Sequence, residues 1–249
     1  MSEQAEVAAS PFGRMTATHK LYVYLCAVFV SCLLLGDIIG GKTITMPYLG
    51  AISVGILPFP VTFLLTDIVN DFYGKAGARF VTILGFCMAV LAWIILQLTT
   101  WWQPDPSTYF TQAEYAKIFG GSAQLFVASM IAYLIGQFLD IHVFQLWKAL
   151  TESRHLWLRA TGSTALSQIV DTVTINVIFW SWTAAADPAS FLGKMDPAGR
   201  WSWIGLKIGR EYGIKLFVAV LLTPVVYALH AAIVRWLGIE PEKLPPRKA

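Results

Sequence analysis

Six apolar segments, each close to the length of a membrane-spanning helix, dominate this sequence. A helix that crosses the hydrocarbon core of a bilayer, about 30 Å thick, needs about 20 apolar residues. The segments are residues 21–36, 43–66, 80–100, 118–139, 160–186 and 214–234. The sequence therefore predicts an all-α integral membrane protein, built as a six-span helical bundle.

The composition excludes several other classes of protein. With 56% hydrophobic and 13% charged residues, the chain does not resemble a water-soluble globule. The formal net charge is only +3 and the basic residues form no patch, so we expect no nucleic-acid partner. The three cysteines lie in apolar runs and no two histidines have metal-ligand spacing. We therefore expect no disulfide framework, no metal site and no cofactor, and we assign the histidines no role.

Two stretches depart from the pattern of a plain spanning helix. The second segment carries Pro47, Pro58 and Pro60, and proline interrupts a helix because it lacks an N–H and clashes with the preceding turn. We expect a proline-broken second segment made of half-helices. Residues 191–210 mix tryptophan with lysine and arginine, which is typical of a helix lying in the membrane interface. We expect this interfacial helix before the last span.

The distribution of lysine and arginine predicts the orientation, because cytoplasmic loops carry the excess of these residues. With both termini inside, the inner set is Arg14, Lys20, Lys75, Arg79, Lys148, Arg154, Arg159, Arg235, Lys243, Arg247 and Lys248, and the outer set is Lys42, Lys117, Lys194, Arg200, Lys207 and Arg210. We therefore expect two cytoplasmic tails, residues 1–20 and 237–249, around a membrane domain at residues 21–236. We expect the stretch from residue 240 onward to be disordered.

Polar side chains form a stripe along the fifth segment. Thr164, Gln168, Asp171, Thr172 and Asn176 follow the spacing i, i+4, i+7, i+8 and i+12, which places them on one helical face. Ionisable and amide groups in a membrane normally face the bundle interior or a water-filled cavity. The stripe predicts such a cavity, although interhelical hydrogen bonds worth about 0.6–2 kcal/mol each are the structural alternative.

Two shorter groups repeat this pattern. Asp67, Asn70 and Asp71 lie at i, i+3 and i+4, and Gln137 and Asp140 lie at i and i+3. Two carboxylates on one face could share a proton, or bind a cation or a ligand rich in hydrogen-bond donors. The alternative is a pair of helix ends that meet cytoplasmic water, with a nearby lysine or arginine neutralising the acids.

Three further charged residues lie near the ends of segments. Lys42 follows a pair of glycines beside the proline-rich segment, and we consider it a candidate ligand or gating contact. Glu211 and Lys215 are spaced i, i+4, and we expect a local ion pair between them.

The motifs of common enzyme classes are missing from the sequence. It contains no H-E-x-x-H, no G-x-S-x-G and no P-loop. We therefore do not expect an enzyme.

Three stretches carry a family resemblance. Residues 59–75 read FPVTFLLTDIVNDFYGK, residues 136–140 read GQFLD, and residues 156–171 read LWLRATGSTALSQIVD. In this order they resemble the motifs of the queuosine precursor transporter family of bacterial inner membranes, also called the vitamin uptake transporter family. With the six spans, the resemblance covers residues 21–236. Asp71 departs from the glutamate found there in many members.

The resemblance implies a multi-pass inner-membrane importer of 7-deazaguanine bases, such as the 7-cyano and 7-aminomethyl precursors of queuosine, for salvage into tRNA. A deazaguanine is flat, with a donor edge and a carbonyl, so carboxylates and amides should bind its edge and an aromatic ring its face. The candidates for the edge are Asp67, Asn70, Asp71, Gln137, Asp140, Gln168, Asp171 and Asn176, with Lys42. Phe59, Phe72, Tyr73, Phe144 and Trp147 are candidates for the stacking ring.

The sequence is compatible with three energy sources. Without an ATP-binding motif, transport would proceed by facilitated diffusion, by proton coupling through a buried aspartate, or with an external ATPase. The last case defines an alternative: the substrate-binding membrane component of an energy-coupling-factor importer for another small vitamin-like molecule. A membrane scaffold that transports nothing is a second alternative. A homodimer is a further hypothesis for so small a bundle.

Overall fold

The computed structural model describes residues 15–40, 42–46, 50–119, 123–152 and 155–242. The elements in chain order are α2 (Ala17–Ile39), β1 (Thr43–Met46), β2 (Gly50–Ser53), η1 (Val54–Ile56), α3 (Phe59–Phe72), α4 (Gly74–Thr99), α5 (Gln112–Phe119), α6 (Ala123–Leu150), α7 (Leu156–Ala186) and α8 (Pro197–Leu237). Within the described residues, six helical segments are long and apolar enough to cross a membrane. The prediction of an all-α, six-span membrane protein is confirmed.

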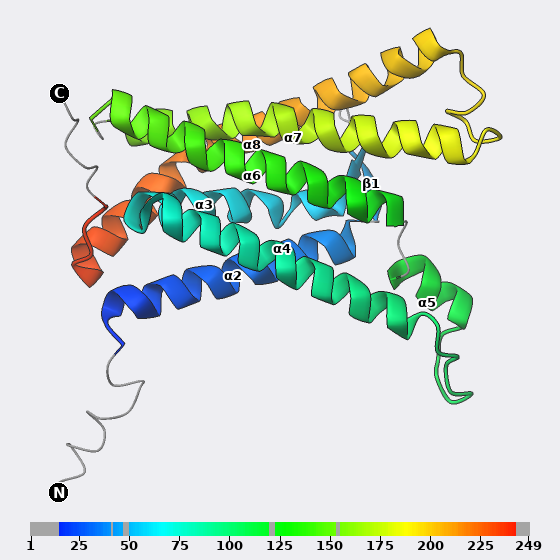
Figure 1. Cartoon of the computed structure of the whole chain (residues 1–249), viewed down its shortest axis with the longest axis horizontal. Coiled ribbons are helices and arrows are strands. Elements are labelled where there is room, and N and C mark those ends of the chain that lie inside the picture. The colour runs from blue at the N-terminus through cyan, green and yellow to red at the C-terminus, as the bar shows by residue number, and fades with distance from the viewer. Residues whose placement is uncertain (1–14, 41, 47–49, 120–122, 153–154, 243–249) are drawn as a thin grey trace, which may run out of the picture.

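The six spanning helices run along the long axis of the molecule (Figure 1). α2 begins and α8 ends at the same end of the bundle, and we call this the terminal end; the β1–β2 hairpin and α5 lie toward the opposite end. Among the helices, α6 and α7 pack against each other most extensively. Their close approach includes Gly136, where an added Cβ would lie 3.1 Å from the Cβ of Asp171.

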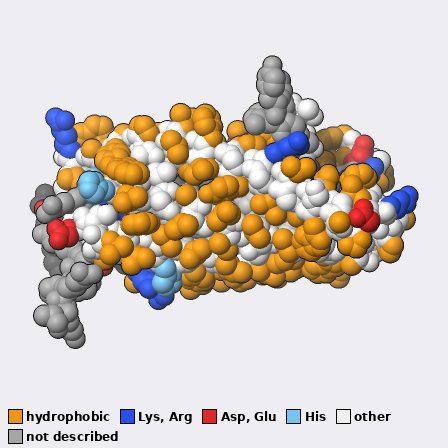
Figure 2. All heavy atoms as spheres, turned by 90° about the horizontal axis from the view of Figure 1, so that it is seen from above, with side chains coloured by type: hydrophobic (Ala, Val, Ile, Leu, Met, Phe, Trp, Pro, Cys, Tyr) orange, Lys and Arg blue, Asp and Glu red, His pale blue; other side chains and the backbone are white. Residues whose placement is uncertain are grey.

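The outer surface matches a lipid environment. Large apolar side chains such as Phe80, Leu91, Phe217 and Leu221 are exposed. Hydrophobic side chains cover the middle of the face in Figure 2, while charged ones gather toward its two ends. The polar side chains of α3, α6 and α7 lie inside instead, as expected where water cannot solvate them.

The second segment differs from its prediction. Its first part pairs as an antiparallel hairpin, with Thr43 opposite Ser53, and the spanning segment is η1 followed by α3, residues Val54–Phe72. The expected half-helices are therefore wrong, because a β-hairpin and a short 3₁₀ turn occupy the first half. Pro58 and Pro60 lie at the start of α3, where a helix tolerates proline because the first N–H groups have no helical acceptor. Pro47 lies outside the described residues.

The stretch at residues 191–210 also differs from its prediction. Instead of a separate interfacial helix, most of it forms the first turns of α8, a single helix of 41 residues. Asp196 caps this helix by accepting a hydrogen bond from the backbone N–H of Gly199 at 3.1 Å, and Pro197 follows in the first turn. These two residues start the helix early, so the basic and aromatic residues extend the last span.

The start of the expected C-terminal tail is folded against the bundle. Ile239 is buried, and the backbone N–H of Glu242 donates to the carbonyl of Asp71 at 2.9 Å. The prediction of disorder from residue 240 is therefore wrong as far as Glu242. Residues 1–14 and 243–249 of the two expected tails lie outside the described residues.

Gly74 makes the tight junction between α3 and α4. Its φ is +64°, a left-handed conformation that costs a residue with a side chain about 1–2 kcal/mol. A Cβ here would also collide with the side-chain carboxylate of Glu242. The junction fixes the direction in which α3 enters the bundle.

We expect Gly74→Ala to lower the melting temperature of the purified protein, because it strains this junction. The matched control is Gly209→Ala in α8, where an added Cβ meets nothing within 4 Å and alanine favours the helix by about 1 kcal/mol. Thermal unfolding in detergent measures both variants. Equal melting temperatures would contradict the strain at Gly74.

Candidate functional site

All but one of the predicted site residues lie inside the bundle. The buried residues are Asp67, Asn70, Asp71, Gln137, Asp140, Gln168, Asp171 and Asn176. Lys42 is exposed instead, directly before β1, away from this interior. The stripe on α7 is confirmed as a buried face, and it lies opposite the polar residues of α3 and α6.

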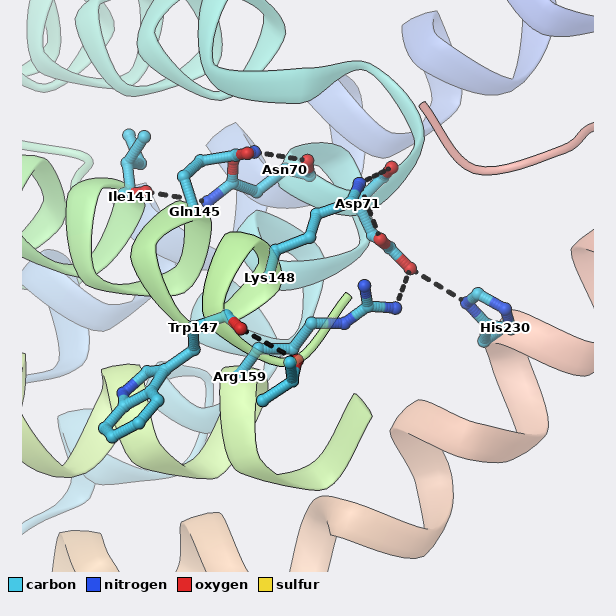
Figure 3. Close-up of polar contacts among 9 residues, drawn as sticks. Asn70, Asp71, Ile141, Gln145, Trp147, Lys148, Arg159 and His230 are labelled. Carbon is cyan, nitrogen blue, oxygen red and sulfur yellow. Dashed lines mark hydrogen bonds and ion pairs between the residues drawn. The ribbon is translucent and has the colours of Figure 1, made fainter. Parts of the chain in front are cut away.

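Asp71 binds three basic side chains at the terminal end of the bundle (Figure 3). Its Oδ1 is 3.0 Å from Lys148 Nζ of α6, and its Oδ2 is 2.9 Å from Arg159 Nη2 of α7. Oδ2 also lies 3.0 Å from Nδ1 of His230 on α8. Lys148 Nζ donates in addition to the backbone carbonyl of Asp71 at 2.9 Å. We call these four residues the Asp71 cluster; it joins α3 to three other helices.

The cluster corrects two expectations. The sequence predicts no role for His230, yet it lies against Asp71. The sequence predicts that Lys148 and Arg159 face the cytoplasm, yet both are buried. The available signal was the set of acids on α3, because a buried carboxylate in a membrane needs a cation, although the sequence does not say which one reaches it.

The side-chain amides of two buried residues, Asn70 and Asn176, form hydrogen bonds with neighbouring helices. Asn70 Oδ1 accepts a hydrogen bond from Gln145 Nε2 at 2.6 Å, and Asn70 Nδ2 donates to the carbonyl of Ile141 at 3.3 Å. Asn176 Nδ2 donates to Glu211 Oε2 at 2.7 Å. These contacts connect α3 to α6 and α7 to α8, which is the structural role considered for the polar stripe.

Lys215 pairs differently from the prediction. Its Nζ lies 2.8 Å from Asp171 Oδ2, while Glu211 pairs with Lys207 at 2.7 Å. The expected Glu211–Lys215 pair is therefore wrong. A local pair on a helix surface is worth only a few tenths of a kcal/mol, whereas an unpaired Asp171 inside the bundle would be costly. Lys215 Nζ also lies 4.4 Å from the centre of the Phe59 ring.

A pocket opens between α3, α7 and α8. Its polar lining residues are Asp67, Thr161, Thr164, Gln168 and Lys215, and its aromatic ones are Phe59 and Phe63. The cavity has a volume of about 40 Å³, room for about three water molecules, so a bicyclic ligand enters only if lining side chains move.

Two side chains in this pocket have hydrogen-bonding capacity to spare. The buried Oδ1 of Asp67 and both amide atoms of Gln168 have no hydrogen-bond partner among the described residues. Buried polar groups in folded proteins are nearly always paired, so such atoms point to a ligand or to water. Together they offer two acceptors and an amide donor beside the Phe59 ring. This arrangement suits the edge and face of a flat polar heterocycle.

An apolar exterior around a buried polar pocket defines a multi-pass membrane protein with a site for a small polar ligand. The comparisons with known proteins agree. The family model described as "Putative vitamin uptake transporter" matches residues 53–229, and the chain belongs to this family.

Three curated relatives are similar to the chain. A Bacillus subtilis protein named "Probable queuosine precursor transporter" is 32% identical over 73% of this chain and 72% of its own length. The "Queuosine precursor transporter" of Escherichia coli is 28% identical over 67% of each chain. A Haemophilus influenzae protein named "Probable queuosine precursor transporter" is 27% identical over 68% of this chain and 63% of its own length. No solved structure matches the chain.

We expect Asp71→Asn to destabilise the protein strongly. The change leaves Lys148 and Arg159 buried without their counter-charge, and breaking a buried ion pair on one side costs about 3–5 kcal/mol. Thermal unfolding and the yield of monodisperse protein measure this loss. Lys207→Gln, which breaks a partly exposed pair on one helix, is the control and should cost less than about 1 kcal/mol. Equal stability of the two variants would rule out a structural role for the cluster.

Proposed function

We propose that this protein imports 7-deazaguanine precursors of queuosine, such as the 7-cyano and 7-aminomethyl bases, across the bacterial inner membrane. The names of the relatives support a queuosine precursor as the substrate. The observation that carries the proposal is the pocket in which Asp67 and Gln168 hold unpaired polar atoms beside an aromatic ring. This chemistry matches the uncharged guanine-like edge and the flat face that both bases share.

The proposed contacts follow from the chemistry of the base. Its ring N–H and exocyclic amino group donate hydrogen bonds to the Asp67 carboxylate, and its carbonyl accepts one from the amide of Gln168. Phe59 covers one face of the ring. Lys215 lies at the wall of the pocket, where Asp171 holds it, so movement of this ion pair would widen the cavity.

The other predicted residues have supporting roles in this proposal. Asn70, Asp71 and Asn176 hold helices together through the contacts described above. Gln137 and Asp140 are buried on α6 and do not line the pocket. Lys42 lies near the start of the hairpin and is not part of the binding site.

The proposed orientation places both termini in the cytoplasm. The even number of spans puts the start of α2 and the end of α8 on one side (Figure 1). Lys75 and Arg79 follow α3 on that side, and Arg235 lies in the last turn of α8, as expected for a cytoplasmic face.

A homodimer stays a prediction. The mass of the protein in detergent and in nanodiscs tests it.

We expect the purified protein to bind 7-cyano-7-deazaguanine, and Asp67→Asn and Gln168→Leu to weaken binding by about fivefold to 150-fold each. A hydrogen bond lost in a buried site costs about 1–3 kcal/mol, and 1.4 kcal/mol corresponds to tenfold in Kd. Isothermal titration calorimetry measures Kd. Asp105→Asn, which changes an exposed loop acid, is the control and should bind like the wild type.

Two results would count against the proposal. A folded wild type that does not bind 7-cyano-7-deazaguanine would exclude this substrate and favour the energy-coupling-factor alternative. Folded Asp67→Asn and Gln168→Leu variants with unchanged Kd would place the base elsewhere in the bundle. Size-exclusion profiles in detergent establish that each variant is folded.

A further inference from the structure

The pocket between α3, α7 and α8 carries one charged group of each sign. Among its described lining residues, Asp67 of α3 and Lys215 of α8 have ionisable side chains, and the others are apolar or neutral. A base that enters this pocket therefore meets both a carboxyl group and an ammonium group.

The two groups lie at opposite ends of the pocket. Nζ of Lys215 lies over the Phe59 ring, 4.4 Å from its centre. Phe59 begins α3, and Asp67 lies about two turns further along, a distance of about 12 Å at 1.5 Å per residue. On α7 the order is the same, because Gln168 lines the pocket and Asp171, the partner of Lys215, lies about one turn beyond it. The pocket thus has a carboxyl end and an ammonium end.

Lys215 has hydrogen-bonding capacity to spare. Its ammonium group has three N–H donors, and among the described residues one hydrogen-bond acceptor is in place, Asp171 Oδ2 at 2.8 Å. The Phe59 ring is its other contact. Because the empty cavity is smaller than a bicyclic base, the ammonium must leave the ring when a base enters. Asp171 keeps it at the same end of the pocket, where a free N–H can bind an acceptor on the base.

The two proposed substrates differ at carbon 7, which lies opposite the donor edge of the bicyclic ring. The nitrile of the 7-cyano base is an uncharged acceptor. The aminomethyl group is a primary amine, which is protonated at neutral pH as lysine is. With the donor edge at Asp67, the substituent at carbon 7 points toward Lys215.

We propose that Lys215 recognises this substituent, so that the protein prefers the 7-cyano base to the 7-aminomethyl base. The inference rests on the proposed function and adds its specificity. The nitrile accepts a hydrogen bond from the Lys215 ammonium, whereas an aminomethyl cation there meets a like charge in a site with little water.

The reversed orientation does not remove this preference. It would place the aminomethyl cation beside Asp67, but it would also turn the donor edge of the base toward Lys215. Donors would then face donors, and the N–H groups of the base would lose their acceptor. The 7-aminomethyl base therefore binds more weakly in either orientation.

The first test compares three ligands on the purified wild type by isothermal titration calorimetry at neutral pH. A hydrogen bond to a charged group is worth about tenfold to 150-fold in Kd, so the 7-cyano base should bind tighter than the 7-aminomethyl base by this factor. The third ligand is 7-hydroxymethyl-7-deazaguanine, an uncharged analogue of nearly the same size as the aminomethyl base. It should bind with an intermediate Kd. A hydroxymethyl base as weak as the aminomethyl base would overturn the inference, because size would then explain the preference.

The second test removes the charge. The double variant Asp171→Asn/Lys215→Met leaves neither charge buried without its partner. The ratio of the aminomethyl Kd to the cyano Kd should fall toward one. Lys207→Gln is the matched control, because Lys207 lies on the same helix, pairs with Glu211 at 2.7 Å and does not line the pocket. It should keep the wild-type ratio, and an equal ratio in the folded double variant would overturn the role of Lys215.

Infrared spectroscopy covers the case in which the double variant does not fold. Hydrogen bonding raises the stretching frequency of a nitrile, so the band of the 7-cyano base bound to the wild type should lie above its position in an aprotic solvent. A band at the aprotic position would overturn the contact with Lys215.

The outcomes also separate this inference from the proposed function. A folded wild type that binds none of the three bases would overturn the proposed function. A wild type that binds the cyano and aminomethyl bases with equal Kd would overturn the specificity alone.

Discussion

Charge buried in a bilayer must be paired or neutralised, and the packing of α3, α6, α7 and α8 depends on this constraint. Asp71 satisfies it with basic side chains from the other three helices. The two ion pairs of Lys148 and Arg159 and the contact of His230 all meet at one carboxylate, so α6 and α7 cannot shift far from α3 without leaving a charge unmatched. The cluster therefore fixes the terminal end of the bundle, while the pocket lies further along α3, α7 and α8.

The pocket follows from the residues that this pairing leaves unmatched. Asp171 is ion-paired with Lys215, and Asp71 is ion-paired within the Asp71 cluster. Asp67 and Gln168, in contrast, have buried polar atoms without a hydrogen-bond partner among the described residues. A stable protein tolerates such atoms where a ligand or water completes them. The same helices thus supply rigid charged contacts on one side and unsatisfied binding groups on the other, as a site for a small polar ligand requires.

The sequence predicts more of the helices than of their contacts. The stripe on α7 is visible because helical periodicity places its members on one face, and the acids of α3 are visible for the same reason. The partners of Asp71 are not, because Lys148 and Arg159 reach it from distant helices whose packing no local pattern encodes. The same limit explains why Lys215 was paired with Glu211, its neighbour in sequence, rather than with Asp171.

The most direct test of the account asks whether the base occupies the pocket between α3, α7 and α8. Val218 lines this pocket, whereas the neighbouring Phe217 is 69% exposed on the outer surface. In a background without the three native cysteines, Val218→Cys and Phe217→Cys can each be alkylated with and without saturating 7-cyano-7-deazaguanine. The bound base should slow alkylation at residue 218 and leave alkylation at residue 217 unchanged. Binding of the base without protection at residue 218 would contradict this placement of the base.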